Sequence, residues 1–342
     1  MRRKLAFSVV VVGLVLAGLE LAARAVEPRF STRTLPLPFP MPTHDHAFEK
    51  RVEEARRAAG DSVPLVFDES AGWTLPPHRT DRYGDAVMRT NALGMRGPDW
   101  PPPAPDEVRL LTFGDSSIYG QGVTEAQVFS SVAAQALADR WKRPVTGIIG
   151  GIPGYTTGQA LALQARVEAR LQPRWVVIGT LWSDLLAVQS APVVERPSAL
   201  ASYRVAAQLL APWLATRKVR FLAAREDVSG NGVQARTGLT LYLRNLRALA
   251  ARATADGARP AFLILPAPMD LDAAPPPETV TQYRAAMRAV ATEVGAPLVD
   301  GVALARRRNA TLAWWTDQVH PSSLGHRELG EALAEALAPL GP

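Results

Sequence analysis

The stretch "VRLLTFGDSSIYGQG", residues 108–122, joins a mostly apolar run to a short polar turn and then to glycines. A short apolar run that ends in turn residues is typical of a strand buried on both faces of a parallel sheet. The turn Gly114-Asp115-Ser116 and the neighbouring Ser117 follow this strand directly. Because ligands bind beyond the carboxyl ends of such strands, either serine is a candidate nucleophile.

The same pattern of apolar runs and amphipathic stretches continues along the chain. Further apolar runs lie at residues 145–149, 175–181, 261–266 and 297–300. Amphipathic stretches with helical spacing lie at residues 126–141, 156–171, 239–257 and 279–295. Two of these end in glycine, Gly257 and Gly295, which is favoured at a helix C-terminus. This alternation predicts an α/β fold: a three-layer sandwich with a central parallel sheet of about five strands and helices on both faces.

Composition divides the chain into three parts. Residues 106–342 carry the alternating pattern, which is interrupted at about 186–235 by a predicted, partly helical insertion. Residues 27–105 are predicted to be a proline-rich extension and linker, with a short helix at 45–60. Residues 1–26 form the third part, an N-terminal membrane anchor or signal peptide.

The N-terminal part combines a basic start, "MRRK", with an uncharged apolar run at residues 5–19. The run is short for a bilayer, which needs about 20 residues, but extending it to residue 23 makes a span feasible. The sequence "ARA" at 23–25 also fits a signal-peptide cleavage site. Both interpretations place residues 27–342 outside the cytoplasm, because basic residues favour the inside. We expect a single-pass anchor with the remainder in the periplasm, or secretion if the segment is cleaved.

Charge and cysteine content exclude several classes of protein. Half of the formal net charge of +6 lies in residues 1–25, and the other basic residues are scattered. No nucleic-acid partner is therefore predicted. Cysteine is absent, so there is no disulfide and no cysteine metal site. The pair His44 and His46 has no carboxylate or cysteine cluster beside it, and we predict neither a metal nor a cofactor.

Polar segments follow the other predicted strands as well. "GGIPGYTTG" begins at Gly150, "WSDL" spans residues 182–185, and "WWTDQVHPSSLGH" begins at Trp314. The carboxyl ends of parallel strands meet at one edge of the sheet. The sequence therefore predicts that these segments gather around Ser116.

A serine hydroxyl needs a base within hydrogen-bond reach, and His320 is the candidate. Asp317 precedes it by three residues, which on a helical turn would place both side chains on one face. The carboxylate could then hold one ring nitrogen while the other faces Ser116. Taken singly, each of these residues is better explained as a helix cap or loop residue. His326 is interpreted as an ordinary surface residue of the final helix.

Taken together and in order, these segments resemble the SGNH (GDSL-type) hydrolases, a family with a flavodoxin-like sandwich. The resemblance covers residues 88–340 and rests on four segments: Gly114-Asp115-Ser116, Gly151, residues 181–184 and Asp317-Gln318-Val319-His320. Upstream, "MRTNALGMRG" at residues 88–97 resembles the lead-in of membrane-anchored members.

The resemblance implies the role of each site residue. Ser116 would be the nucleophile, with His320 and Asp317 completing a catalytic triad. The oxyanion hole would consist of the backbone amides of Ser116 and Gly151 and a third donor. The family has an asparagine at that third position, and this chain has Ser183, whose hydroxyl reaches less far than an amide.

The function expected from these residues is an exported serine esterase that works through an acyl-enzyme intermediate. Its substrate would be a small-molecule or glycan acyl ester, such as a short acyl group on a carbohydrate or envelope component. One alternative is an O-acyltransferase with the same triad. Another is a non-catalytic, glycan-binding envelope protein, which the Ser183 replacement favours. The sequence does not predict the oligomeric state.

Overall fold

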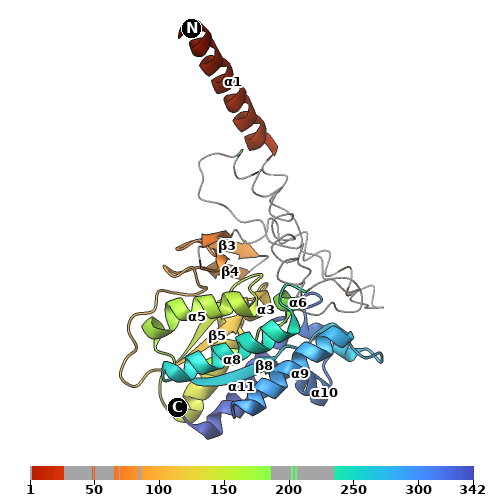
Figure 1. Cartoon of the computed structure of the whole chain (residues 1–342). Helices are drawn as coiled ribbons and strands as arrows, with labels where there is room; N and C mark the ends of the chain where they lie inside the picture. Colours follow the sequence, from red (N-terminus) through yellow and green to blue (C-terminus); the bar gives the residue numbers. More distant parts are fainter. Residues whose placement is uncertain are drawn as a thin grey trace.

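The computed structural model describes residues 2–26, 65–68, 70–83, 86–185 and 235–342, together with residues 48, 50, 202 and 205 (Figure 1). The proline-rich run before residue 45, almost all of the predicted helix at 45–60 and almost all of the predicted insertion at 186–235 lie outside the described residues.

A five-stranded, all-parallel sheet forms the centre of the molecule. Its strands lie in the order β6-β5-β7-β8-β9, and every residue of β5 and β7 is buried. Their bounds are β5 Val108–Gly114, β6 Val145–Gly151, β7 Trp175–Ile178, β8 Arg259–Ile264 and β9 Leu298–Asp300. Burial on both faces explains why these runs are apolar throughout. The predicted parallel sheet is confirmed.

Helices cover both faces of this sheet, which confirms the three-layer sandwich. On one side α4 packs against α11, and on the other α5, α8 and α9 contact one another in sequence (Figure 1). Their bounds are α4 Phe129–Trp141, α5 Thr157–Leu171, α8 Leu239–Ala255, α9 Glu278–Glu293 and α11 Ser323–Leu337. Gly257 and Gly295 follow α8 and α9 with φ angles of 82° and 63°, the left-handed conformation expected of a glycine there.

Short helices begin at the carboxyl ends of the central strands. Two matter for the site, α3 (Ser116–Tyr119) after β5 and α6 (Trp182–Leu185) after β7. The remaining short elements are α10 Gly301–Arg307 and the 3₁₀ turns η2 Glu125–Gln127, η3 Pro268–Leu271, η4 Leu312–Trp314 and η5 Ala338–Leu340. The chain passes from β5 outward to β6 and then returns to β7 on the other side of β5. That reversal between β5 and β7 is where open α/β sheets bind their ligands.

The segment predicted as an extension and linker is, in its described part, packed against the sheet domain. It forms two antiparallel pairs, β1 (Val66–Asp68) with β2 (Gly72–Thr74) and β3 (Thr80–Tyr83) with β4 (Ala86–Arg89). Leu75 and Met95 from this segment are fully buried in the same apolar core as the sheet. The part of 27–105 that begins at residue 65 is therefore not a free extension.

The proline-rich run at residues 98–107 is also held in place. The amide of Asn91 donates to the Pro98 carbonyl at 3.0 Å, and the Arg109 guanidinium donates to the Pro101 carbonyl at 2.6 Å. Asp99 accepts from the backbone N–H of Ala92 at 2.8 Å. These hydrogen bonds attach the end of the predicted linker to the sheet domain.

The N-terminal helix α1 spans Arg2–Val26. Val12, Leu14, Leu16 and Leu21 on this helix are more than half exposed. Within the part of the chain that the structure describes, no helix combines the length and the apolar character that a membrane crossing requires.

Candidate active site

The turn after β5 is built around a buried carboxylate. Asp115 caps α3, since its Oδ1 accepts from the backbone N–H of Ser117 at 2.9 Å. This interaction is a standard N-cap, and it makes Ser116 the first residue of the helix. The helix ends after one turn, at Gly120 in a left-handed conformation. The local sequence thus presents Ser116 at the carboxyl edge of the sheet.

Three side chains from opposite ends of the domain form a continuous hydrogen-bonded chain. The Ser116 Oγ lies 2.7 Å from His320 Nε2, and His320 Nδ1 lies 2.6 Å from Asp317 Oδ2. The other carboxylate oxygen of Asp317 accepts from the backbone N–H groups of Val319 and His320 at 2.9 and 2.8 Å. The structure therefore brings together the three residues that the sequence selected as a triad.

The loop that carries Asp317 and His320 differs from the predicted helical turn. It is an irregular loop, closed by a bridge between Trp315 and Pro321. Ser117 was predicted only to help begin the segment after the nucleophile. Its hydroxyl in fact donates to the Val319 carbonyl at 3.1 Å and so ties this loop to α3.

In this row of hydrogen-bonded side chains, Asp317 and His320 each stabilise the charged form of the other. Burial alone would lower the pKa of His320, but the charge of Asp317, its hydrogen bond and the charge of Asp115 raise it above the ordinary 6.5. Burial would likewise raise the pKa of Asp317, yet His320 and the backbone donors hold it below 3.8. The arrangement therefore keeps Asp317 ionised and stabilises a positive charge on the imidazole.

Gly151, the second predicted oxyanion donor, ends β6 in direct contact with α3. It is paired with Gly114 in the register of β5 and β6. A Cβ atom at Gly151 would lie 2.3 Å from the Tyr119 nitrogen and 2.6 Å from the Ile118 carbonyl carbon. Because both are backbone atoms, only glycine allows β6 to approach α3 this closely.

Ser183, the third predicted donor, lies on α6 beside the same turn. Its backbone N–H donates to Asp115 Oδ2 at 3.1 Å, and the residue is 2% exposed. Burial raises the pKa of Asp115, while the N–H groups of Ser117 and Ser183 oppose that shift. The structure thus places Ser183 next to the turn that carries Ser116.

Asp184 has a structural role that the sequence did not predict. This buried carboxylate accepts from the backbone N–H of Thr157 at 3.0 Å and from its hydroxyl at 2.8 Å, at the start of α5. Asn245 donates to the same hydroxyl at 3.1 Å. Burial raises the pKa of Asp184 to about 7. The only available signal was its place after Ser183, at the end of a predicted strand.

The interpretation of His326 as a surface residue is wrong. The residue is fully buried on α11, and its ring stacks on Phe129 at 6.1 Å between centroids. Its Nδ1 accepts from the Phe129 backbone N–H at 3.3 Å. Burial lowers its pKa to about 3, so the ring is neutral. The spacing of His326, Leu329 and Leu333 along one helix face was the missed signal.

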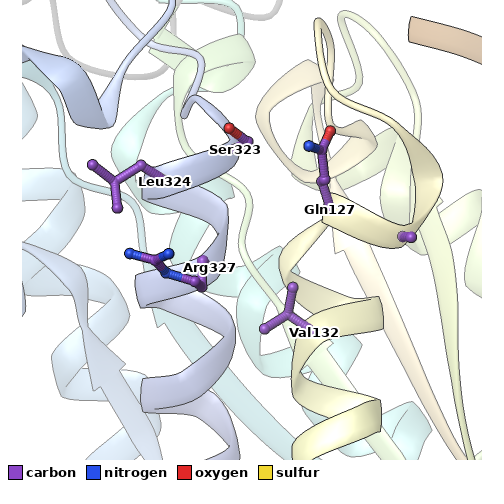
Figure 2. A pocket seen from close by; sticks show the side chains of 6 residues that line it. Gln127, Val132, Ser323, Leu324 and Arg327 are labelled. Atoms are coloured by element: carbon purple, nitrogen blue, oxygen red, sulfur yellow. The ribbon is translucent and has the colours of Figure 1, made fainter.

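A separate hollow of about 310 Å³ lies on the side of the domain. Figure 2 shows Ser323, Leu324 and Arg327 on one helix across from Gln127 and Val132. It is lined by none of the three residues of the hydrogen-bonded chain.

Among the described residues, no group of three or more histidine, cysteine, aspartate or glutamate side chains could hold a metal ion. His44 and His46 lie outside that part of the chain.

The fold and the site together define an ester-hydrolysing enzyme of three-layer α/β architecture. The model of the GDSL-like Lipase/Acylhydrolase family matches residues 112–328, well over half of the sequence, and the chain belongs to this family. Ser116, Asp317 and His320, the residues of the hydrogen-bonded chain, all fall within the matched region.

The solved structures to which this chain is similar are distant in sequence, and their TM-scores are below 0.5. TesA is 19% identical, with a TM-score of 0.45 over 68% of this chain and 99% of its own. A mutant of Axe2, an acetyl-xylooligosaccharide esterase from Geobacillus stearmophilus, is 19% identical, with a TM-score of 0.45 over 67% and 94%. A lipase/acylhydrolase from Enterococcus faecalis is 15% identical, with a TM-score of 0.45 over 68% and 96%. No curated protein sequence matches the chain.

Replacement of Gly151 by alanine should damage the site selectively. The added Cβ would force β6 away from α3, displacing the Gly151 amide, and we expect kcat to fall by about 10²–10³, as for loss of an oxyanion donor. The matched control is Gly158→Ala on α5, where a Cβ would lie no closer than 3.6 Å to other atoms. Ester hydrolysis and thermal unfolding of both variants measure the effect. Equal kcat in the two variants would contradict this assignment.

Proposed function

We propose that the protein hydrolyses an acyl ester through a covalent acyl-enzyme formed on Ser116. The observation that carries this proposal is the chain from Asp317 Oδ2 through both nitrogens of His320 to Ser116 Oγ, with distances of 2.6 and 2.7 Å. This geometry is the one that activates a serine hydroxyl. Membership of the acylhydrolase family supports the same chemistry.

The first half of the reaction forms the acyl-enzyme. Ser116 Oγ attacks the acyl carbonyl carbon while its proton passes to His320 Nε2. Asp317 stabilises the resulting imidazolium through the hydrogen bond to Nδ1. The tetrahedral intermediate then breaks its bond to the alcohol oxygen, which takes the proton from His320. In the second half, water attacks the acyl carbon and gives a proton to His320. The tetrahedral intermediate then breaks its bond to Ser116 Oγ, which takes that proton back from His320, and the acid leaves.

The intermediate carries a negative oxygen that needs fixed donors. The backbone amides of Ser116 and Gly151 supply the main stabilisation in this proposal, supported by the close packing of β6 on α3. The hydroxyl of Ser183 is a weaker third donor than the asparagine amide that the family resemblance leads us to expect.

The substrate in this proposal carries a short acyl group on a carbohydrate or another envelope component. Trp73 supports it, because this half-buried ring borders the turn that follows Gly151. Its indole N–H donates to the Pro153 carbonyl at 3.2 Å, and the Arg236 guanidinium lies 6.0 Å from the ring centroid. Aromatic rings with a few placed polar groups are the usual lining of sites for such ligands.

The same proposal includes export of residues 27–342. Its support is the basic sequence at residues 2–4 followed by the uncharged run at 5–19. Side chains that are more than half exposed on α1 include Val12, Leu14 and Leu16. A helix that leaves such side chains uncovered favours an apolar environment around it.

The direct test combines covalent labelling with turnover. We expect a fluorophosphonate to label the wild-type protein at Ser116, and we expect acid release from both an activated acetyl ester and an O-acetylated oligosaccharide. Ser116→Ala should abolish labelling and turnover with an unchanged melting temperature. Labelling of Ser117 instead would reject the assignment. Hydrolysis of the activated ester alone would reject the carbohydrate part.

Activity and the stability contribution of His320 should change with pH in opposite directions. Only the neutral imidazole accepts the Ser116 proton, so kcat/KM should rise with pH with a midpoint above 6.5. The raised pKa adds stability that is fully present below pH 6.5 and is lost as pH rises through the folded value. Each tenfold gain in proton affinity on folding contributes about 1.4 kcal/mol. Asp317→Asn removes the negative charge that contributes most to raising the pKa of His320, and it should therefore lower the midpoint of the kcat/KM profile. A wild-type midpoint at or below 6.5, or no change in the variant, would contradict this.

Location can be tested in bacterial cells that express the full chain. Protease added outside spheroplasts should degrade residues 27–342 while a cytoplasmic marker survives. The matched variant carries Arg2→Glu, Arg3→Glu and Lys4→Glu, which removes the charge that favours the inside and should reduce this degradation. Full protection of the wild-type chain would show that it is not exported.

A further inference from the structure

The sequence "MRTNALGMRG" at residues 88–97 delivers a fully buried arginine to the end of the nucleophile helix. The Arg96 Nη1 donates to the carbonyls of Tyr119 at 2.8 Å and Gly120 at 2.6 Å, and Nη2 donates to the carbonyl of Val123 at 2.5 Å. The guanidinium also lies 5.1 Å from the centroid of the Tyr119 ring. A segment upstream of the sheet therefore contacts the helix that begins at Ser116.

We infer that Arg96 is a positioning residue that holds Ser116 and Gly151 in their working geometry. This inference rests on the proposed function, because it concerns the nucleophile and the oxyanion donor of that reaction.

Arg96 supplies hydrogen-bond donors to carbonyl groups at the end of the short helix α3. Because α3 has only four residues, the Tyr119 carbonyl at its end has no intrahelical partner, and the next carbonyl, that of Gly120, accepts from the Val123 N–H only at 3.3 Å. A cation at a helix C-terminus satisfies these groups and complements the helix dipole. Burial lowers the pKa of Arg96, while Tyr119 and Glu125 oppose that shift. A planar guanidinium can reach three carbonyls at once, whereas a lysine ammonium is a single point.

The backbone of Arg96 contacts the other half of the oxyanion hole. Arg96 forms an antiparallel bridge with Ile149 of β6, two residues before Gly151. Its side chain donates hydrogen bonds to the end of α3, and its main chain pairs with β6. A single residue thus connects the two elements whose amides would bind the oxyanion.

The turn that presents Arg96 is itself fixed by Asn91. The side-chain oxygen of Asn91 accepts from the backbone N–H groups of Leu93 at 2.9 Å and Met95 at 3.1 Å. Its amide donates to the Pro98 carbonyl at 3.0 Å. Because Met95 is fully buried beside it, the backbone at Arg96 cannot shift freely.

The position of α3 matters for the reaction, because a small displacement of Ser116 would break its hydrogen bond to His320. Productive geometry must be held to about 0.5 Å, and a misplacement of about 1 Å can cost about 10²-fold in rate. Loss of the grip on Tyr119 and Gly120 would let α3 move without removing any group that touches substrate. The loss should therefore appear in kcat rather than in KM.

The test compares Arg96→Lys with a matched arginine at the opposite end of the sheet. Arg109, at the start of β5, is 1% exposed and also donates to main-chain carbonyls, those of Leu171 at 3.2 Å and Pro101 at 2.6 Å. Both lysine variants should lower the melting temperature. We expect only Arg96→Lys to lower kcat, by about ten- to a hundredfold, with KM within twofold of wild type. Arg109→Lys should keep kcat within twofold.

Two further measurements keep the inference falsifiable. Asn91→Ala keeps the arginine but removes the hydrogen bonds that fix the turn before it. It should lower kcat by a smaller factor than Arg96→Lys does, and it replaces Arg96→Lys in the test if that variant fails to fold. Hydrogen exchange over residues 116–123 should quicken in Arg96→Lys but not in Arg109→Lys, and this readout needs no turnover. A wild-type protein without esterase activity or labelling would reject the proposed function. An active wild type with unchanged kcat in Arg96→Lys, equal losses in both lysine variants, or unchanged exchange would overturn the inference alone.

Discussion

The carboxyl edge of the sheet depends on one fully buried carboxylate, that of Asp115. Its two oxygens accept from the backbone N–H groups of Ser117 and Ser183, which belong to the turns after β5 and β7. A buried carboxyl group that loses a hydrogen-bond partner destabilises the fold, so separating the two turns would lower the stability of the domain. Open α/β sheets bind their ligands at such a reversal of strand order, which here lies between β5 and β7, and at this place Asp115 is fully buried and Ser116 is half-buried.

A second buried carboxylate extends this connection to the third strand end. Asp184 follows Ser183 on α6 and accepts from the main chain and hydroxyl of Thr157, at the start of the helix that follows β6. Gly151 lies in the same β6-to-α5 connection. The ends of β5, β6 and β7 are thus joined through two acidic side chains and backbone donors. Burial raises the pKa of both groups, because both carboxyl groups give up solvent where they hold these turns together.

The parallel sheet, its flanking helices and the convergence of Ser116, Asp317 and His320 could all be predicted, because buried strands and amphipathic helices leave strong periodic patterns. The environments of Arg96 and His326 could not be read in the same way. Arg96 looks like a surface charge until its three carbonyl partners are known, and these lie more than twenty residues away in the sequence. The partner of His326 is Phe129, which is 197 residues away in the sequence. Local sequence reports which face of an element is apolar, and it does not report which backbone groups will need a donor.

The loop that carries Asp317 illustrates the same limit inside the site. A three-residue spacing suggested a helical turn, but the segment is an irregular loop, and the N–H groups of Val319 and His320 have the same relation to Asp317 as the first free N–H groups of a helix have to its N-cap residue. In the irregular loop they are free to donate to Asp317 Oδ1, which fixes the carboxylate and aims its other oxygen at Nδ1 of His320. With its proton on Nδ1, as this hydrogen-bond pattern assigns it, the neutral ring turns its Nε2 lone pair toward Ser116. The hydrogen bonds of Asp317 thus direct the imidazole toward Ser116, which is the arrangement that the proposed proton transfer requires.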